Sequence, residues 1–186
     1  MPRSLLLLAV LCLFAFPLRT QTSQQPQAAP VAPAADSADV ASPDAILAAT
    51  YDVISGSAGK KRDWDRFRSL FSPGARLVPV GESKAGGFAA RTLSPEEYVS
   101  HGDAYFEKNG FFEREIARRT ERWGNILQAF STYESRHDAK DSAPFERGIN
   151  SFQLYFDGKR WWVVNIMWQG ETPSTRLTPE FLSSRP

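Results

Sequence analysis

The sequence predicts an α+β domain in which three helices are followed by, and pack on one face of, a curved antiparallel sheet. Two aromatic-rich apolar runs, Phe145–Phe156 and Trp161–Trp168, flank an Asp157-Gly158 pair. Since the glycine tolerates positive φ, the two runs form a predicted β-hairpin. The helix-start signals lie ahead of these runs, beginning with Ser42-Pro43-Asp44. Helices first and long strands afterwards is the order typical of the α+β class.

Each predicted helix has its own start signal. The first has Ser42 as N-cap and proline at its first position, carries an apolar stripe, and ends before Gly56–Gly59. The second opens at Asp63 and stops at Ser72-Pro73-Gly74. The third begins at Ser94, whose Ser-x-x-Glu pattern is a capping box, and ends at Asn109-Gly110. The apolar residues that define these helices are Ile46, Leu47, Tyr51, Ile54, Trp64, Phe67, Leu70, Phe71, Tyr98, Tyr105 and Phe106.

The predicted sheet begins with a short strand, Ala75–Val80, followed by a loop over Gly81–Gly87. Phe111–Trp123 has a charge density that also suits a helix, but Gly124-Asn125 and a β-branched, aromatic run, Ile126–Arg136, come next. We therefore expect two long antiparallel strands around that turn. A polar loop, 137–144, then leads into the hairpin.

The N-terminal 42 residues are expected to lie outside the domain. Arg3 and the 12-residue apolar run Leu5–Phe16 predict a signal peptide over residues 1–20, because a membrane span takes about 20 residues. The alternative is an uncleaved N-terminal anchor. Residues 21–42, rich in Pro, Ala and Gln, predict a disordered linker. We expect a domain at 43–172, a tail at 173–186, and an exported protein that is periplasmic or secreted.

The amino-acid composition argues against several classes of function. With 22 basic and 21 acidic residues, the net charge of +1 gives no basic excess for nucleic-acid binding. The single cysteine, Cys12, lies in the predicted leader, which excludes a disulfide framework or thiolate metal site in the mature chain. His101 and His137 have no histidine partner at metal-ligand spacing. We expect no metal, no cofactor, no nucleic-acid partner and no membrane span in the mature chain.

Three sequence blocks resemble the nuclear-transport-factor-2-like (NTF2-like) superfamily, in the SnoaL-like and steroid-isomerase-like branch. They are Asp63–Ala75, Gly124–Ser135 and Asp157–Trp168, and the likeness extends from about Asp44 to Gln169. The resemblance implies a cone-shaped, strongly curved, mostly antiparallel sheet, with the three helices on its concave side around a pocket. It also implies a homodimer. Because the superfamily spans isomerases, dehydratases, cyclases and scaffolds, it does not decide the function.

The steroid-isomerase mechanism can be tested residue by residue. Tyr51 falls near the family's tyrosine position, but Val78 stands where the base belongs and Phe152 where the acid belongs. Neither side chain transfers protons, so the resemblance does not carry that mechanism over. The remaining catalytic candidates are Tyr51 with His101 or Asp103.

Six residues are predicted ligand contacts, and they are Tyr51, Tyr98, Arg119, Tyr133, Asn165 and Met167. Asn165 and Met167 occupy final-strand positions where related sequences often have pocket histidines. Strict alternation along Phe111–Trp123 places Arg119 and Glu115 on one face, and Arg114 and Arg118 on the other. We expect the second face to be a solvated outer face with cross-strand pairs to Glu134. The functional alternative is that Arg119 enters the pocket and binds an acidic ligand.

Three functions remain open at this stage. The leading hypothesis is a module that binds a small apolar or acidic molecule in an aromatic-lined pocket. The alternative is an isomerase, dehydratase or cyclase acting on a small apolar substrate. The third is an assembly domain without a working pocket. The enzyme hypothesis requires a titratable group in the cavity, and the sequence predicts rings there instead.

Overall fold

The computed structural model describes residues 33–184, which contain four α-helices and six strands. The helices are α1 (Ser37–Val40), α2 (Pro43–Ile54), α3 (Trp64–Leu70) and α4 (Pro95–Lys108). The strands are β1 (Phe71–Glu82), β2 (Phe88–Ala90), β3 (Phe112–Trp123), β4 (Ile126–Arg136), β5 (Glu146–Phe156) and β6 (Trp161–Gly170), followed by the 3₁₀ helix η1 (Pro179–Phe181). The predicted leader and residues 21–32 of the predicted linker lie outside the described residues.

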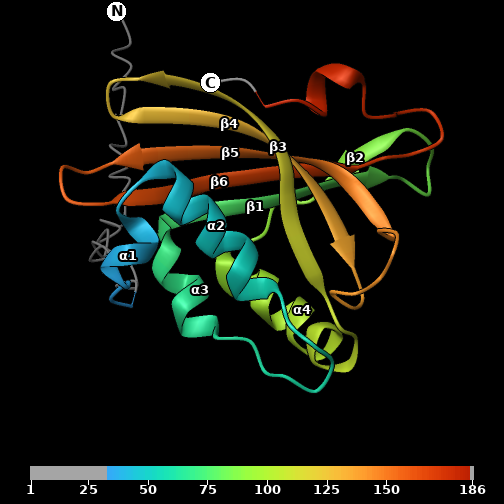
Figure 1. Ribbon diagram of the computed structural model, residues 1–186, viewed down its shortest axis with the longest axis horizontal. Helices are drawn as coiled ribbons and strands as arrows, with labels where there is room; N and C mark the ends of the chain where they lie inside the picture. The colour runs from blue at the N-terminus through green and yellow to red at the C-terminus, as the bar shows by residue number, and fades with distance from the viewer. Residues whose placement is uncertain (1–32, 185–186) are drawn as a thin grey trace, which may run out of the picture.

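The six strands form one curled, mixed sheet with helices on its concave side (Figure 1). The strand order is β2-β1-β6-β5-β4-β3, and β1 and β6 pair in parallel whereas the other neighbours are antiparallel. Helix α2 packs against β3, which bends round toward α4. The predicted α+β class and curved, mostly antiparallel sheet are therefore confirmed. Strand β1 is longer than predicted, and β2 was not predicted.

The predicted caps and turn are present. The Ser42 hydroxyl accepts a hydrogen bond from the Ala45 amide at 3.1 Å, and Asp63 accepts one from the Arg66 amide at 2.9 Å. At Ser94 both halves of the capping box form. In the hairpin turn Gly158 has φ of 96°, which an L side chain rarely adopts. Local sequence signals thus determine where these elements begin and end.

The folded part begins earlier than predicted. Helix α1 lies inside the predicted linker, and Val40 is buried with the core. Asp39 also pairs with Arg66 of α3, with an Nε–Oδ2 distance of 2.7 Å. The disordered-linker prediction is therefore wrong for residues 37–40. One buried valine and one ion pair suffice to hold this short turn against α2 and α3.

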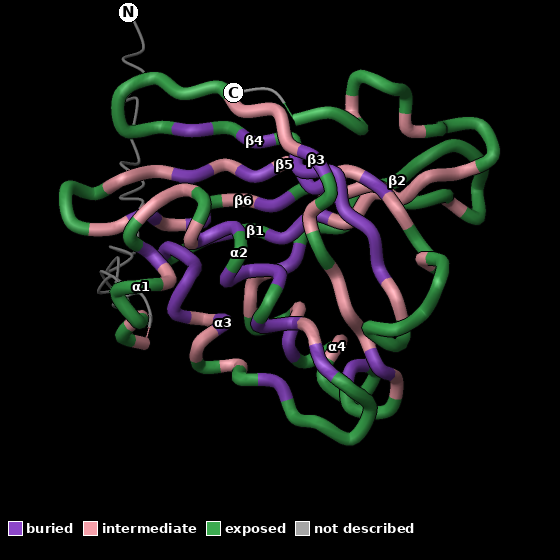
Figure 2. Tube along the Cα trace, viewed as in Figure 1, coloured by how far each residue is buried: buried purple, intermediate pink, exposed green. Residues whose placement is uncertain are grey.

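The core lies between the helices and the concave face (Figure 2). Its largest fully buried apolar side chains are Tyr133, Phe67, Phe152, Ile46, Leu47, Leu70 and Val163. The buried Arg62 has no ion pair among the described residues, and its guanidinium donates to the carbonyls of Ile54, Gly56 and Lys60. Arg62 thereby satisfies carbonyls at the end of α2 and in the connection that follows.

Two β-bulges change which side chains face the helices. In β3, Glu115 pairs with Tyr133 and Ala117 with Thr132, which leaves Ile116 as an extra residue. In β6, Val163 pairs with Leu154 and Asn165 with Gln153, which leaves Val164 extra. Each extra residue inverts the inside–outside alternation of the residues that follow it. These inversions decide which predicted site residues reach the cavity.

The C-terminal segment, Thr172–Ser184, lies against the sheet on the face opposite the helices. The Thr132 hydroxyl of β4 donates to the Phe181 carbonyl, and the Arg118 amide of β3 donates to the Ser184 hydroxyl at 3.2 Å. We call this segment the strap. Within residues 33–184, no helix is both long enough and apolar enough to cross a membrane.

Candidate functional site

A cavity of about 270 Å³ lies between the helices and the concave face of the sheet. Helices α2, α3 and α4 and strands β1, β3, β4, β5 and β6 all contribute side chains to it. The lining residues are Thr50, Tyr51, Ile54, Phe67, Leu77, Tyr98, Tyr105, Phe106, Phe111, Glu113, Tyr133, Phe145, Glu146, Asn150, Phe152, Ile166 and Trp168. Three of the predicted contacts, Tyr51, Tyr98 and Tyr133, are among them.

Five aromatic rings form a continuous arc around part of this cavity. Trp168 meets Tyr98 edge-on at 6.2 Å between ring centres, and Tyr98 lies 6.2 Å from Phe106. The arc continues from Phe106 to Phe111 at 5.0 Å, and from Phe111 to Phe145 at 6.1 Å. Rings in mutual contact hold one another in place, so this wall is apolar and preformed.

Glu113 of β3 places a carboxyl group in the cavity. The side chain accepts hydrogen bonds from the Ser135 hydroxyl at 2.9 Å and from the Asn150 amide at 3.2 Å. Burial, opposed by these two hydrogen bonds and reinforced by the nearby charge of Glu146, raises the pKa of Glu113 to about 7. At neutral pH this group both accepts and releases a proton readily.

A second carboxyl group, that of Glu146, lies at the exposed side of the cavity. It accepts a hydrogen bond from the hydroxyl of Tyr133, and burial with this bond raises the Tyr133 pKa far above its usual value. Gly148 makes the contact possible, because a Cβ there would lie 2.8 Å from the Tyr133 hydroxyl. Strands β4 and β5 thus bring Tyr133 and Glu146 together at the cavity.

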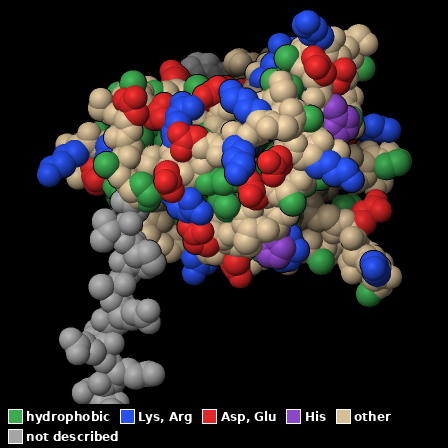
Figure 3. Space-filling model, turned by 90° about the horizontal axis from the view of Figure 1, so that it is seen from below, with side chains coloured by type: hydrophobic (Ala, Val, Ile, Leu, Met, Phe, Trp, Pro, Cys, Tyr) green, Lys and Arg blue, Asp and Glu red, His purple; other side chains and the backbone are tan. Residues whose placement is uncertain are grey.

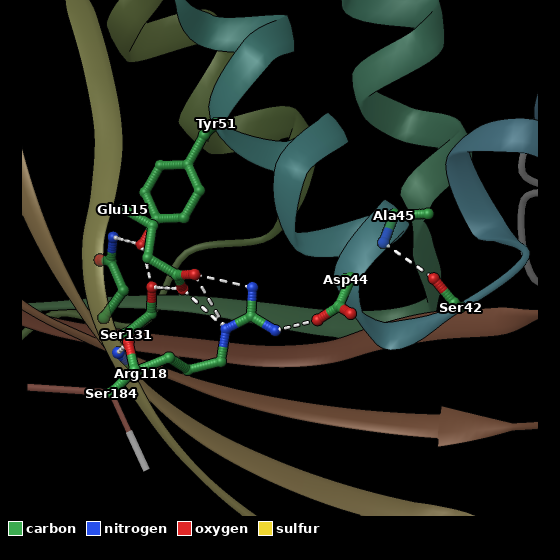
Figure 4. A network of polar contacts seen from close by, with 9 residues as sticks. Ser42, Asp44, Ala45, Tyr51, Glu115, Arg118, Ser131 and Ser184 are labelled. Atoms are coloured by element: carbon green, nitrogen blue, oxygen red, sulfur yellow. Dashed lines mark hydrogen bonds and ion pairs between the residues drawn. The ribbon is translucent and has the colours of Figure 1, made fainter. Parts of the chain in front are cut away.

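The hydroxyl of Tyr51 donates its proton to a neighbouring side chain and not into the cavity (Figure 4). Ser131 donates to Glu115, so its oxygen accepts the Tyr51 proton at 2.6 Å. The Tyr51 oxygen in turn accepts from the Asn150 amide at 3.2 Å. Arg118 completes the chain by donating to both carboxylate oxygens of Glu115 at 2.9 Å. Tyr51 therefore lines the cavity as a positioning residue and has no proton free for a ligand.

The bulges move three predicted contacts out of the cavity. Arg119 lies on the opposite face, where its guanidinium stands 5.4 Å from the Phe181 ring centre and 3.6 Å from Glu180. Arg118 takes the inner position instead. Met167 faces the strap, and Asn165, two residues before it, does not line the cavity either. None of these three lines the cavity, contrary to prediction. Strict alternation placed Arg119 inside, and the extra residue Ile116 inverts that alternation. The resemblance placed Asn165 and Met167 inside, and the extra residue Val164 shifts them away from the cavity face.

The other catalytic candidates lie on the outside of α4. His101 is exposed and its Nδ1 contacts the Glu97 carbonyl of its own helix. Asp103 is exposed and accepts a 2.7 Å hydrogen bond from the Trp64 indole. Neither lines the cavity, so the predicted pairing of Tyr51 with His101 or Asp103 is wrong. The predicted cross-strand pair does form, since Arg114 donates to Glu134 at 2.6 Å.

The charge of the cavity differs from that of the outer surface. On the surface seen from the helix side, basic and acidic side chains are interspersed (Figure 3). Among the lining residues, in contrast, the ionisable groups are Glu113, Glu146 and four tyrosines, without lysine, arginine or histidine. In the described part of the chain, no cluster of three His, Cys, Asp or Glu residues has the arrangement to hold a metal ion.

Comparison with known proteins identifies solved structures with a similar architecture. No family model matches the chain, and no curated protein matches it. Among solved structures, a Nostoc punctiforme protein of unknown function with a cystatin-like fold aligns at a TM-score of 0.51 and 12% identity, over 72% of this chain and 90% of that one. NTF2-like proteins of unknown function from Shewanella baltica and Silicibacter pomeroyi align at 0.43 and 0.44, each at 15% identity. They cover 68% and 70% of this chain, and 89% and 94% of their own.

The chain has a cystatin-like fold. In this fold the cavity lies between the helices and the curled sheet, as the sequence resemblance implied. The fold alone does not determine what the cavity does. Glu113 and Glu146 were not predicted as site residues, although both lie at the start of predicted strands. Their distance of 33 positions along the chain hid their convergence, which only the β3-β4-β5 pairing creates.

Proposed function

We propose that the protein binds a small molecule with an apolar body and one polar group in the cavity between the helices and the sheet. The observation that carries this proposal is the ring-lined space of about 270 Å³ with carboxyl groups at one side. Its size lies just below the range of about 300–1,000 Å³ typical of sites for drug-sized ligands, so a compact molecule fits best.

A screen of small ring compounds by protein NMR tests this proposal. Trp168 lines both the cavity and the space between strap and sheet, so its indole N–H signal reports on the cavity when the ring signals of Tyr98, which lines the cavity alone, shift with it. Trp123 lies at the far end of β3, is 83% exposed, and serves as an internal control. We expect a binding compound to shift the Trp168 signal and leave the Trp123 signal unchanged. It should also raise the melting temperature, because it binds the native state alone. A screen in which no compound perturbs Trp168 contradicts the proposal.

A second candidate function is proton transfer of the isomerase, dehydratase or cyclase kind. The observation in its favour is the Glu113 carboxyl group, which has a pKa of about 7 in a largely apolar cavity. Such a group can remove a proton from a carbon acid and return it at another position.

Exchange of solvent deuterium into a panel of small ketones, followed by NMR, tests this second function. We expect Glu113→Gln to reduce exchange by about 100-fold or more. Glu121→Gln, which removes an exposed carboxylate from the same strand, should leave the rate unchanged. Exchange that is equal in both variants, or absent from the wild-type protein, argues against catalysis by Glu113.

A further inference from the structure

We propose that the cavity selects a small organic cation, an amine with an aromatic or alkyl body, whose ammonium group lies at Glu113 and Glu146. This inference rests on the proposed function, since it names the chemical class of the molecule bound there. It replaces the acidic ligand expected while Arg119 was predicted to enter the pocket.

The donors that pair with the two carboxyl groups are already used within the protein, and of the lining tyrosines only Tyr98 and Tyr105 have no hydroxyl hydrogen bond within residues 33–184. The side-chain amide of Asn150 donates its two protons to Tyr51 and Glu113, and the Tyr133 hydroxyl donates to Glu146. Each oxygen of Glu113 accepts one protein hydrogen bond, from Asn150 or Ser135. A carboxylate has about four acceptor sites, so Glu113 retains room for ligand donors. An ammonium group supplies such donors, whereas a ligand carboxylate would meet like charge.

The ring arc suits the same class of ligand. The negative face of an aromatic ring attracts a cation within about 6 Å of its centre, and clustered rings are a known means of recognising organic ammonium groups. The arc of Trp168, Tyr98, Phe106, Phe111 and Phe145 lines the same cavity as the two carboxyl groups. A cation with an apolar body would therefore find both counter-charge and ring faces in one space.

The protein supplies no cation of its own to the cavity lining. The guanidinium of Arg62 lies 5.9 Å from the Phe106 ring centre, but its nitrogen atoms donate to backbone carbonyls. Arg118 is held by Glu115 and Asp44, outside the lining residues. The carboxyl groups of Glu113 and Glu146 thus have no lysine or arginine partner there.

Three matched probes separate the ligand classes, namely benzylamine, benzyl alcohol and benzoate, titrated at pH 8 against the Trp168 indole signal. Because a charge-assisted hydrogen bond is about twice as strong as a neutral one, we expect benzylamine to bind about tenfold more tightly than benzyl alcohol. Benzoate should bind most weakly. In Glu113→Gln the preference for the amine should fall below about threefold, whereas the control Glu121→Gln should retain it.

The outcomes distinguish the two proposals. If benzyl alcohol or benzoate binds as tightly as benzylamine, the cation inference is overturned while the small-molecule proposal stands. If none of the three perturbs Trp168, the cation inference also fails, and the wider ring-compound screen decides the small-molecule proposal. Glu146→Gln provides a second variant at the exposed side, where the substitution leaves the deeper hydrogen bonds in place, and it should also weaken benzylamine binding.

A permanently charged probe, benzyltrimethylammonium, adds a pH test. The charged and ionisable groups around Glu113 come from the strands, the helices and the loop after β4. They are Glu146 on β5, Tyr51 and Asp52 on α2, Tyr98 on α4, Tyr133 and Arg136 on β4, Arg114, Glu115 and Arg118 on β3, and Asp141 in the loop. The tyrosines have raised pKa values and stay neutral. Affinity should therefore rise severalfold from pH 6 to pH 8 as Glu113 ionises, and should stay flat in Glu113→Gln. A flat wild-type profile would overturn the role of Glu113 as counter-ion.

Discussion

At the residue scale, Glu113 distinguishes this cavity from a simple apolar pocket. Its surroundings supply two hydrogen-bond donors, Ser135 and Asn150, but too few to offset the cost of burying its charge. The group therefore remains partly protonated at neutral pH. An apolar residue would pack here without that cost, so the carboxyl group is a candidate for function rather than for stability.

Glu113→Gln should stabilise the protein at alkaline pH. The folded-state pKa of about 7 exceeds the ordinary value of 4.5, so folding favours the protonated form, and stability from this group falls as pH rises from about 4.5 to 7. The glutamine side chain does not ionise, so the variant does not lose this stability as the pH rises. We expect it to be about 2–3 kcal/mol more stable than the wild type at pH 8, and equal to it near pH 4.5. Urea unfolding at both pH values measures the difference. A variant less stable than the wild type at pH 8 would contradict the assigned pKa shift.

Tyr51→Phe tests the hydrogen-bond chain behind the cavity. The substitution removes the proton that Ser131 accepts and the oxygen that Asn150 donates to, so we expect a loss of about 1–3 kcal/mol in the free energy of unfolding. Tyr98→Phe is the matched control, because Tyr98 lines the same cavity and its hydroxyl has no hydrogen bond within residues 33–184. Equal effects of the two substitutions in urea unfolding would argue against the chain.

At the element scale, the sequence predicted α2, α3, α4 and the long strands but not α1 or the direction of every side chain. Caps at Ser42, Asp63 and Ser94 and the turn at Gly158 are local signals, and the structure follows them. A β-bulge has no comparable local signal, because it depends on how two strands pair. The extra residue Ile116 therefore put Arg119 on the face opposite to the one that strict alternation predicted. The extra residue Val164 likewise moved Asn165 and Met167, which the family resemblance had placed in the pocket, off the cavity face.

Arg62→Met should destabilise the connection between α2 and α3. The substitution keeps an apolar stem but removes the guanidinium donors from the carbonyls of Ile54, Gly56 and Lys60, of which Gly56 keeps the Phe111 amide as a donor. We expect a loss of about 2–4 kcal/mol in the free energy of unfolding, since two buried acceptors and one part-buried acceptor lose a charged partner at once. Lys61→Met, at the exposed neighbouring position, is the control and should change stability by less than about 0.5 kcal/mol. Urea unfolding that gives the two variants the same midpoint would refute this role for Arg62.

At the scale of the whole molecule, the two faces of the sheet are covered by different means. The helices and the cavity occupy the concave face, and the strap crosses part of the other face. Between strap and sheet lies a second, mainly apolar space of about 330 Å³, lined by residues that include Phe130, Ile149, Met167 and Phe181. The homodimer implied by the family resemblance remains a prediction, and any sheet-to-sheet contact would have to accommodate the strap.

Removal of the strap should make the protein self-associate. A chain that ends at Thr172 loses the contacts of Phe181 with Thr132 and Phe130, and leaves Phe130, Ile149 and Met167 open to solvent. Because a contiguous apolar patch favours association, sedimentation velocity should show concentration-dependent growth in mass relative to the full chain. The free energy of unfolding at low concentration should fall by about 1–3 kcal/mol. Leu182→Ser in the full chain, at an exposed strap position outside the apolar space, should change neither quantity. A shortened chain with unchanged mass and stability would show that the strap contributes nothing to covering this face.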